Sequence, residues 1–477
     1  MAKISEYFRL NQHQAQLDFV DVDTERDKAL YIDPVPLGRG VDSWSQDCSA
    51  ALTSYFQAIV DAIREGRGAE GLRLLDGLHE PNETSLGLSQ GRPSGRGIGD
   101  IQARQLYERI RQSRAAQTGI LSELSDLELF VPRIGEDKIS DITTNIIRRQ
   151  LIQFTQAQCE LHAMPMEADV PTGFLWNQGT AQWDNQFTRL PVIDGRKILL
   201  VPKSAVRWNL AFSHEQFREH FVLSYMQDEH LANDTALVET LRNGRRRVTK
   251  KSLKAEYRID KEFLARFAAD HPNVLAEYKA VLDIPPEVST DELAEGFDEV
   301  AFAEQLIAEL QRIDRGSAHA ERYHKFCVGL LEFLFFPSLV MPEKEYEIHE
   351  GRKRIDVVYT NNAELGFFGA MLAHPRVGCR KLIVECKNYS KDCANPELDQ
   401  IAGRFSPLRG RLGFLMGRNF DNRRRFVERC RDTAKDDRGI ILPFEDKDLV
   451  DMLNWVRLRQ RQNIERRLHQ LFDEVSN

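Results

Sequence analysis

KLIVECKNYS, residues 381–390, is the stretch that decides the fold, because it places a glutamate and a lysine at the end of an apolar run. The run 382–384 precedes Glu385, a pattern typical of a short buried β-strand. Side chains alternate along a strand, so Glu385 and Lys387 project from one face and Cys386 from the other. A buried carboxylate is costly without a cation. The segment therefore predicts both a core strand and a polar site on it.

A second strand is expected within YEIHEGRKRIDVVYT, residues 346–360, where Asp356 stands between Ile355 and Val357. If the two strands are neighbours, Asp356 joins Glu385 and the lysine on the same face. Two carboxylates suit Mg²⁺ or Mn²⁺, which take oxygen ligands and keep positions for water and phosphate oxygens. A lysine beside such an ion can orient or deprotonate an attacking water.

The pattern around these strands is that of an α/β domain. Helices are expected at 301–336, 396–406, 422–434 and at the C-terminus, alternating with strands at 346–360, 381–390, 411–418 and 438–446. This alternation predicts a mixed sheet flanked by helices.

The rest of the chain predicts a mainly helical α+β region. Helices are expected at 43–78, 101–125, 139–163 and over most of 213–282, with a strand at 197–202. The double proline in IPPE, residues 284–287, is followed by a helix start, which predicts a boundary between a region 1–290 and a domain 291–477. A further division near 165–200 is left open.

The motif Asp356, then Glu385-Cys386-Lys387, then a helix with Gln400, resembles the PD-(D/E)XK nuclease superfamily in its Mrr-type branch, over about residues 315–450. The resemblance implies an α/β restriction-endonuclease-like core that hydrolyses DNA with a divalent metal. Asp356 and Glu385 would then be metal ligands, together with the carbonyl of Cys386. Lys387 would be the catalytic lysine, and Gln400 would complete the site.

The chain departs from the family at the preceding helix, where a glutamate is usual about seven residues before a core leucine. Counting back from Leu331 leads to His324, and Glu321 lies one turn earlier. We expect Glu321 to supply the missing acid, with His324 as the alternative.

The net charge of −8 conceals an uneven distribution, because residues 351–430 hold 16 Lys or Arg against 8 Asp or Glu. A basic segment within an acidic chain indicates a phosphate-binding surface. The expected contacts to the DNA backbone are Arg352, Lys353, Arg354, Arg404, Arg409 and Arg411. A second basic run, NGRRRVTKK at 243–251, has two interpretations, a solvated turn or a DNA contact.

The seven cysteines form no C-x-x-C pair, and no apolar run reaches 18 residues. The chain is therefore expected in the cytoplasm, away from membranes, with reduced thiols. We expect a Mg²⁺-dependent endonuclease of double-stranded DNA whose architecture resembles restriction and anti-phage defence effectors. That architecture implies a homo-oligomer and a partner defence protein. The alternatives are an inactive nuclease-fold protein for DNA binding or assembly, and a DNA repair or recombination nuclease.

Overall fold

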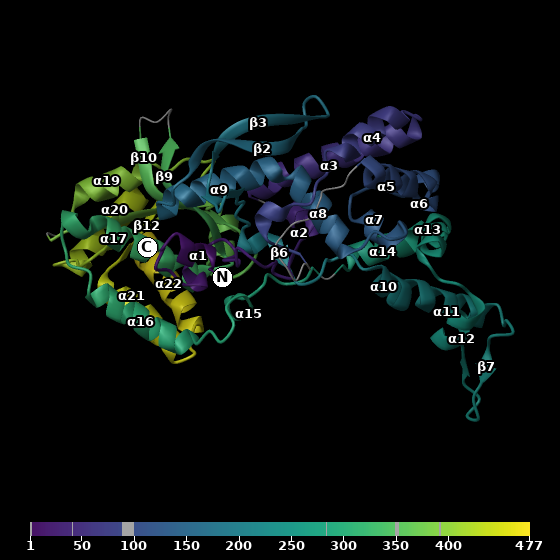
Figure 1. Ribbon diagram of the computed structural model, residues 1–477. Coiled ribbons are helices and arrows are strands. Elements are labelled where there is room, and N and C mark those ends of the chain that lie inside the picture. Colours follow the sequence, from purple (N-terminus) through teal and green to yellow (C-terminus); the bar gives the residue numbers. More distant parts are fainter. Residues whose placement is uncertain (1, 41, 88–99, 283, 349–352, 391–392) are drawn as a thin grey trace.

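The protein is a mixed α/β molecule with a mainly helical N-terminal region and a C-terminal core built on a sheet (Figure 1). The computed structural model describes residues 2–40, 42–87, 100–282, 284–348, 353–390 and 393–477, with the backbone alone at 100–103, 345–348 and 353–355. Within these ranges no helix is long and apolar enough to cross a membrane.

Helices make up most of the N-terminal region. They are α1 (Ile4–Tyr7), α2 (Pro34–Arg39), α3 (Ser43–Arg64), α4 (Gly68–Asp76), α5 (Asp100–Gln112), α6 (Arg114–Thr118), α7 (Asp126–Phe130), α8 (Glu136–Ile146), α9 (Arg148–His162), α10 (His214–Gln216), α11 (Leu223–Ala232), α12 (Lys250–Glu256), α13 (Lys261–Asp270), α14 (Pro272–Ala280) and α15 (Thr290–Leu293). Single turns connect them, namely η1 (Gln14–Gln16), η2 (Asn82–Thr84), η3 (Lys203–Ala205) and the π-helical η4 (Phe217–Val222).

The helix pair predicted at 43–78 is confirmed as α3 and α4. The Asp42 side chain accepts a hydrogen bond from the Ser45 amide at 2.9 Å and caps α3, whose apolar face is buried. The strand predicted at 197–202 is wrong apart from Lys197, which ends the two-residue strand β5 (Arg196–Lys197), and apart from an isolated bridge between Pro202 and Phe19. The strands of this region pair as β1 (Tyr31–Ile32) with β6 (Val206–Arg207), β2 (Glu167–Asn177) with β3 (Gln182–Leu190), β4 (Val192–Ile193) with β5 (Arg196–Lys197), and β7 (Glu239–Thr240) with β8 (Arg246–Arg247).

The C-terminal core alternates helices and strands as the sequence predicted. Its helices are α16 (Glu299–Gln311), the turn η5 (Ser317–His319), α17 (Ala320–Phe335), α18 (Gly366–Ala373), α19 (Asn395–Ala402), α20 (Arg423–Lys435), α21 (Asp446–Arg457) and α22 (Gln462–Ser476). Its strands are β9 (Leu339–Ile348), β10 (Lys353–Asn361), β11 (Lys381–Lys387), β12 (Leu412–Gly417) and β13 (Ile440–Phe444).

Two of the predicted elements of this core are corrected. The helix predicted at 301–336 is two helices, α16 and α17, because Gly316 between them has a φ of +112° that a helix does not allow. The strand predicted at 346–360 is the antiparallel pair β9 and β10, and the segment that joins them lies outside the described residues.

In the described residues the core sheet has five strands in the order β13-β12-β11-β10-β9. β9, β10 and β11 are antiparallel, whereas β11, β12 and β13 are parallel. α17 packs on β9 and β11, and α20 and α22 pack on β13. The fold is therefore a mixed sheet flanked by helices, with β11 at its centre.

Two clusters of buried apolar side chains stabilise the molecule. One draws mainly on residues up to 293 and the other mainly on residues from 302 onward. The two clusters adjoin, because Met341 of the C-terminal core packs in the first cluster and Leu161 of the N-terminal region packs in the second. The domain boundaries predicted at 290/291 stay a prediction.

A buried ionic cluster crosses this boundary. The Lys203 ammonium lies 3.0 Å from Oε1 of Glu332 on α17, with both side chains essentially inaccessible. Asp18 is also buried and accepts a hydrogen bond from the Met341 amide at 2.9 Å. Burial raises the pKa of both Asp18 and Glu332. The N-terminal region and the core thus meet through charges that have no solvent around them.

Candidate active site

Asp356 and Glu385 lie side by side on neighbouring antiparallel strands. β10 and β11 pair with Val357 opposite Val384, so the next step along the same register places Asp356 opposite Glu385. Directly opposite side chains project from the same face of a sheet. The neighbouring strands that the sequence analysis assumed are present, and they bring the two carboxylates together.

Lys387 connects the two carboxylates. Its Nζ lies 3.0 Å from Oε2 of Glu385 and 3.5 Å from Oδ2 of Asp356. The backbone amide of Cys386 also donates to Oδ2 of Asp356, at 3.2 Å. The Glu385 side chain is inaccessible, whereas that of Asp356 is 30% exposed. Solvent therefore reaches this site from the Asp356 side.

The Cys386 thiol lies on the opposite face of β11, as the alternation along the strand predicted. A hydrogen bond with Cys327 of α17, together with burial, raises the pKa of this thiol. The thiol is therefore kept protonated and away from the carboxylates. The carbonyl of Cys386 remains the part of this residue that the family resemblance implicates.

Arg404 is a member of the site that the sequence analysis did not recognise. It directly follows Gly403, the C-cap of α19, and its guanidinium forms an ion pair with Oε1 of Glu385. Its side chain is 8% exposed, and burial lowers its pKa while Asp356 acts in the opposite direction. The sequence analysis assigned Arg404 to the DNA backbone, and no sequence signal linked it to a glutamate on another element.

The structure brings His324, and not Glu321, to the carboxylates. The half-buried His324 ring makes a hydrogen bond with the backbone of Asp356, and burial lowers its pKa against the opposing effect of that residue. The Glu321 side chain is 82% exposed and lies 3.7 Å from the ammonium of Lys344. Glu321, the expected third acid, is therefore outside the carboxylate cluster. His324, the alternative, is the residue of this helix that contacts Asp356.

Among the described residues, no hydrogen bond or ion pair links Gln400, Arg409 or Arg411 to the side chains of Asp356, Glu385 and Lys387. Gln400 lies on α19 with an exposed side chain. Arg409 donates two hydrogen bonds to the carbonyl of Arg404, at 2.9 and 3.1 Å, and Arg411 pairs with Asp437 at 3.0 Å. Arg409 and Arg411 are thus partly occupied within the protein, and their contact with DNA stays a prediction.

Three of the predicted DNA contacts cannot be placed. Arg352 lies outside the described residues, and Lys353 and Arg354 stand at the start of β10, where the backbone alone is described.

A short polar network fixes the loop next to the site. The Asn388 side chain donates to the carbonyls of Asp314 and Gly316, at 3.0 and 2.8 Å, and accepts from Arg418 at 2.9 Å. Asn388 directly follows Lys387 on the chain, so this network ties the end of β11 to the start of α17. The lysine and the helix that carries His324 are held in one arrangement.

The oxygen donors of the cluster fit a hydrated divalent ion. Among the described residues no three His, Cys, Asp or Glu side chains are grouped to hold a metal. Mg²⁺ needs fewer, because it keeps several waters and binds through one or two carboxylates and substrate phosphates. Asp356, Glu385 and the carbonyl of Cys386 would supply these oxygens, provided that Arg404 releases Oε1 of Glu385.

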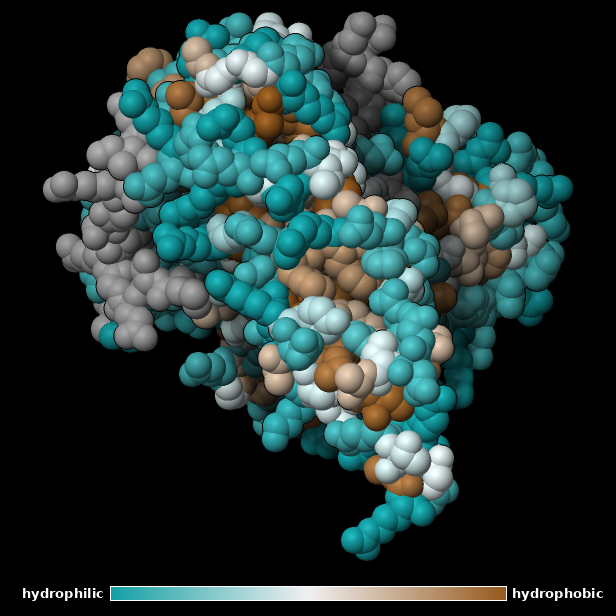
Figure 2. All heavy atoms as spheres, turned by 90° about the vertical axis from the view of Figure 1, so that its right-hand side faces the viewer, coloured by the Kyte–Doolittle hydropathy of each residue, from teal (hydrophilic) through white to brown (hydrophobic). Residues whose placement is uncertain are grey.

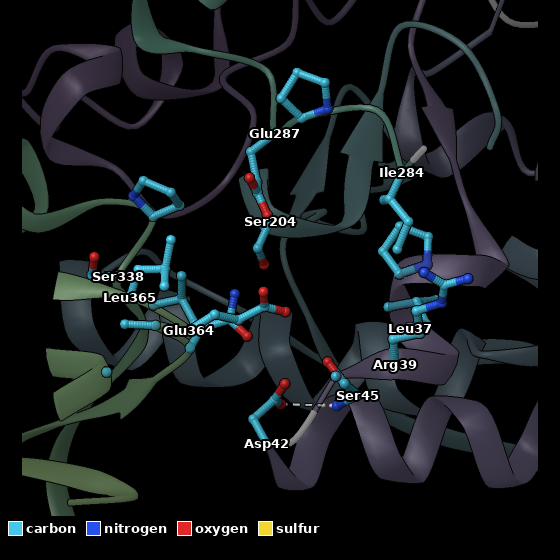
Figure 3. Close-up of a pocket in the computed structure, with 18 of the residues that line it drawn as sticks. Leu37, Arg39, Asp42, Ser45, Ser204, Ile284, Glu287, Ser338, Glu364 and Leu365 are labelled. Carbon is cyan, nitrogen blue, oxygen red and sulfur yellow. Dashed lines mark hydrogen bonds between the residues drawn. The ribbon is translucent and has the colours of Figure 1, made fainter. Parts of the chain in front are cut away.

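A separate cavity of about 840 Å³ lies where the N-terminal region, the segment 282–287 and the core meet (Figure 3). Arg39, Glu287 and Glu364 line it from these three parts. The residues that line it do not include Asp356, Glu385 or Lys387. It is therefore separate from the carboxylate cluster.

Comparison with known proteins informs only the N-terminal region. A family model described as a domain of unknown function (DUF8370) matches residues 9–213. No curated protein and no solved structure matches the chain. The matched segment ends before α16 begins and does not include the carboxylate cluster.

Proposed function

We propose that the chain is a divalent-metal-dependent endonuclease of double-stranded DNA, with a C-terminal core of the PD-(D/E)XK type. One observation carries the proposal: Asp356 and Glu385, from two paired strands, share the ammonium of Lys387 within 3.5 Å. The mixed sheet supports it, because the central strand β11 carries both Glu385 and Lys387.

Each residue of the cluster has a distinct part in the proposed hydrolysis. Asp356 and Glu385 would hold Mg²⁺ or Mn²⁺, which when bound polarises the scissile phosphate and lowers the pKa of a bound water. Lys387 would align the attacking water and offset the charge that develops on the phosphate. His324 would keep the Asp356 backbone in position. Bacterial restriction or anti-phage defence is the setting that the architecture favours.

A second candidate is a nuclease fold that binds DNA or assembles on it without cutting. One observation favours it, namely that Glu321 is exposed and leaves the cluster with two acids. A third acid would strengthen metal binding, so its absence gives this alternative a physical basis.

A plasmid-cleavage assay separates the two candidates. Wild type is compared with Lys387→Ala and with the control Lys447→Ala, which removes an exposed lysine of the same core. We expect nicking with Mg²⁺ and none with EDTA, a loss of at least about 100-fold in Lys387→Ala, and no loss in the control. Equal nicking by wild type and Lys387→Ala, or no cleavage under any condition including an added partner protein, contradicts the nuclease proposal.

A further inference from the structure

The segment 241–251, here called the basic hairpin, concentrates positive charge far from the carboxylate cluster. Its eleven residues include six Lys or Arg and no Asp or Glu, in a chain of net charge −8. Such a density of one sign does not follow from the average composition. It creates a positive potential at the surface that attracts anions.

The local structure is a tight two-stranded ribbon. β7 and β8 pair antiparallel, with Thr240 opposite Arg246, and the Leu241 amide donates to the Arg245 carbonyl at 2.8 Å. The turn is made by Asn243 and Gly244, whose φ of +79° is readily adopted by glycine. The run forms a turn, with Arg242 before it and Arg245 after it, and the choice between a solvated turn and a DNA contact stays untested.

Among the described residues, four of the six cations of the hairpin have no counter-charge. Arg246 pairs with Asp234, Arg247 pairs with Glu239 at 3.3 Å, and the Lys250 ammonium donates to a main-chain carbonyl. The other three are exposed, and within the part of the chain that the structure describes no ion pair or side-chain hydrogen bond engages them. These three are Arg242, Arg245 and Lys251.

The base of the hairpin is fixed to the helices beside it. Val248 is 3% exposed and Leu253 is fully buried, so both anchor the ribbon to the apolar core. The Val248 carbonyl accepts a hydrogen bond from Gln227 of α11, and Thr249 caps α12 through the Ser252 amide at 3.1 Å. The ribbon is therefore anchored at its base, and its exposed cations face solvent.

The hairpin stands at the tip of a projecting arm. α10, α11, α12 and β7 extend from the N-terminal region at the end of the molecule opposite the C-terminal core (Figure 1). The same projection is the lowest part of the molecule in Figure 2, and its end is hydrophilic. A ligand held there would approach from outside the molecule without touching the core.

We propose that the basic hairpin is a second contact surface for double-stranded DNA, which it holds through the phosphate backbone. A two-stranded ribbon fits a groove of the duplex, and arginine is the residue best suited to phosphate oxygens. Binding at a lipid surface uses apolar side chains beside the cations, and the tip 242–247 has none. The choice of DNA among polyanions rests on the proposed function. The hairpin adds a grip on DNA that is remote from the scissile bond.

The experiment measures DNA affinity against salt concentration in full-length protein carrying Lys387→Ala, so that cleavage does not interfere. The hairpin variant R242Q/R245Q/K251Q is compared with R73Q/R104Q/R114Q, which removes three exposed cations from α4, α5 and α6. Each phosphate contact contributes about 0.9 to the slope of log affinity against log salt concentration. We expect the hairpin variant to lower that slope by about 2.7, and the control to leave it unchanged.

An equal slope in both variants overturns the inference. So does loss of binding to phosphatidylserine vesicles in the hairpin variant while its DNA slope is unchanged. The outcome does not depend on the proposed function, because cleavage is measured separately. If wild type never cleaves DNA but the hairpin variant lowers the salt slope, the nuclease proposal is refuted and the DNA contact of the hairpin is supported. If wild type cleaves DNA and the hairpin variant leaves the slope unchanged, the nuclease proposal stands and the DNA contact of the hairpin is refuted.

Discussion

The carboxylate of Glu385 and the guanidinium of Arg404 form an ion pair in which both side chains are buried, with exposures of 0% and 8%. The second oxygen of the same carboxylate lies 3.0 Å from Lys387. Glu385 therefore has a cation on each oxygen, and a metal ion at this carboxylate would share it with Arg404. Metal binding at Glu385 would therefore compete with the ion pair to Arg404.

Replacing Arg404 by methionine should destabilise the metal-free protein and strengthen its response to metal. Breaking a buried ion pair costs about 3–5 kcal/mol where it leaves a charge without compensation, and Lys387, which still pairs with Glu385, should keep the loss below that range. Mg²⁺ or Mn²⁺ at Glu385 would restore that compensation. We expect Tm to fall in EDTA and to rise with metal by more in Arg404→Met than in wild type. Equal metal-dependent shifts in the two proteins would contradict this account.

The buried pair of Lys203 and Glu332 should be essential for stability. Lys203→Met leaves Glu332 and Asp18 without a cation in the interior, so we expect the free energy of unfolding to fall by about 3–5 kcal/mol in urea titrations. Adding Glu332→Gln to the same protein removes the uncompensated charge and should recover part of the loss. Exposed Lys447→Met serves as the control. A loss in the control as large as that in Lys203→Met would remove the support for this interpretation.

Asp141 should make stability depend on pH. Burial raises its pKa to about 7, although Lys138 acts in the opposite direction. Because the folded-state pKa of Asp141 lies above its unfolded value, its contribution to the free energy of unfolding is fully present below about pH 4. This contribution is lost as the pH rises through 7. Asp141→Asn should therefore equal wild type near pH 4 and exceed it by up to about 4 kcal/mol above pH 7. Urea titrations across this range test it, and parallel curves would refute it.

His324 and Glu321 should differ in their effect on cleavage. His324 contacts the Asp356 backbone, so we expect His324→Ala to lower the rate of plasmid cleavage by about 10-fold or more. Glu321 is exposed beside Lys344, and Glu321→Gln should stay within about 2-fold of wild type, as expected of a surface ion pair. The reverse order of the two effects would restore Glu321 as the third acid.

The strands of the core could be predicted wherever their apolar runs were continuous. β11 and β12 were expected near their observed positions, whereas β9 begins at Leu339, seven residues before the expected start. Pro342 and the charged residues 343–345 interrupt its apolar pattern. They are tolerated because β9 is the edge strand of the sheet and, among the described residues, has no strand paired on its outer side.

The break between α16 and α17 shows a limit of local patterns. Residues 314–317, Asp-Arg-Gly-Ser, carry no large apolar side chain, so Gly316 was a local signal of the break that the prediction of one helix overlooked. The Asn388 side chain, more than 70 residues away in the chain, holds the carbonyls of Asp314 and Gly316 in a non-helical loop. That contact could not be predicted from the local sequence.

Short apolar runs that alternate with helical segments were enough to predict the α/β core, and the two-residue repeat of a strand placed Glu385 and Lys387 on one face. An acid within such a run singled out Asp356, and a run of like charges singled out residues 243–251. Only the tertiary structure decided that His324 replaces Glu321 beside Asp356, that Arg404 neutralises Glu385, and that the hairpin stands apart from the core. Ion pairs and burial depend on distances between elements far apart in sequence, and those distances exist only in the folded chain.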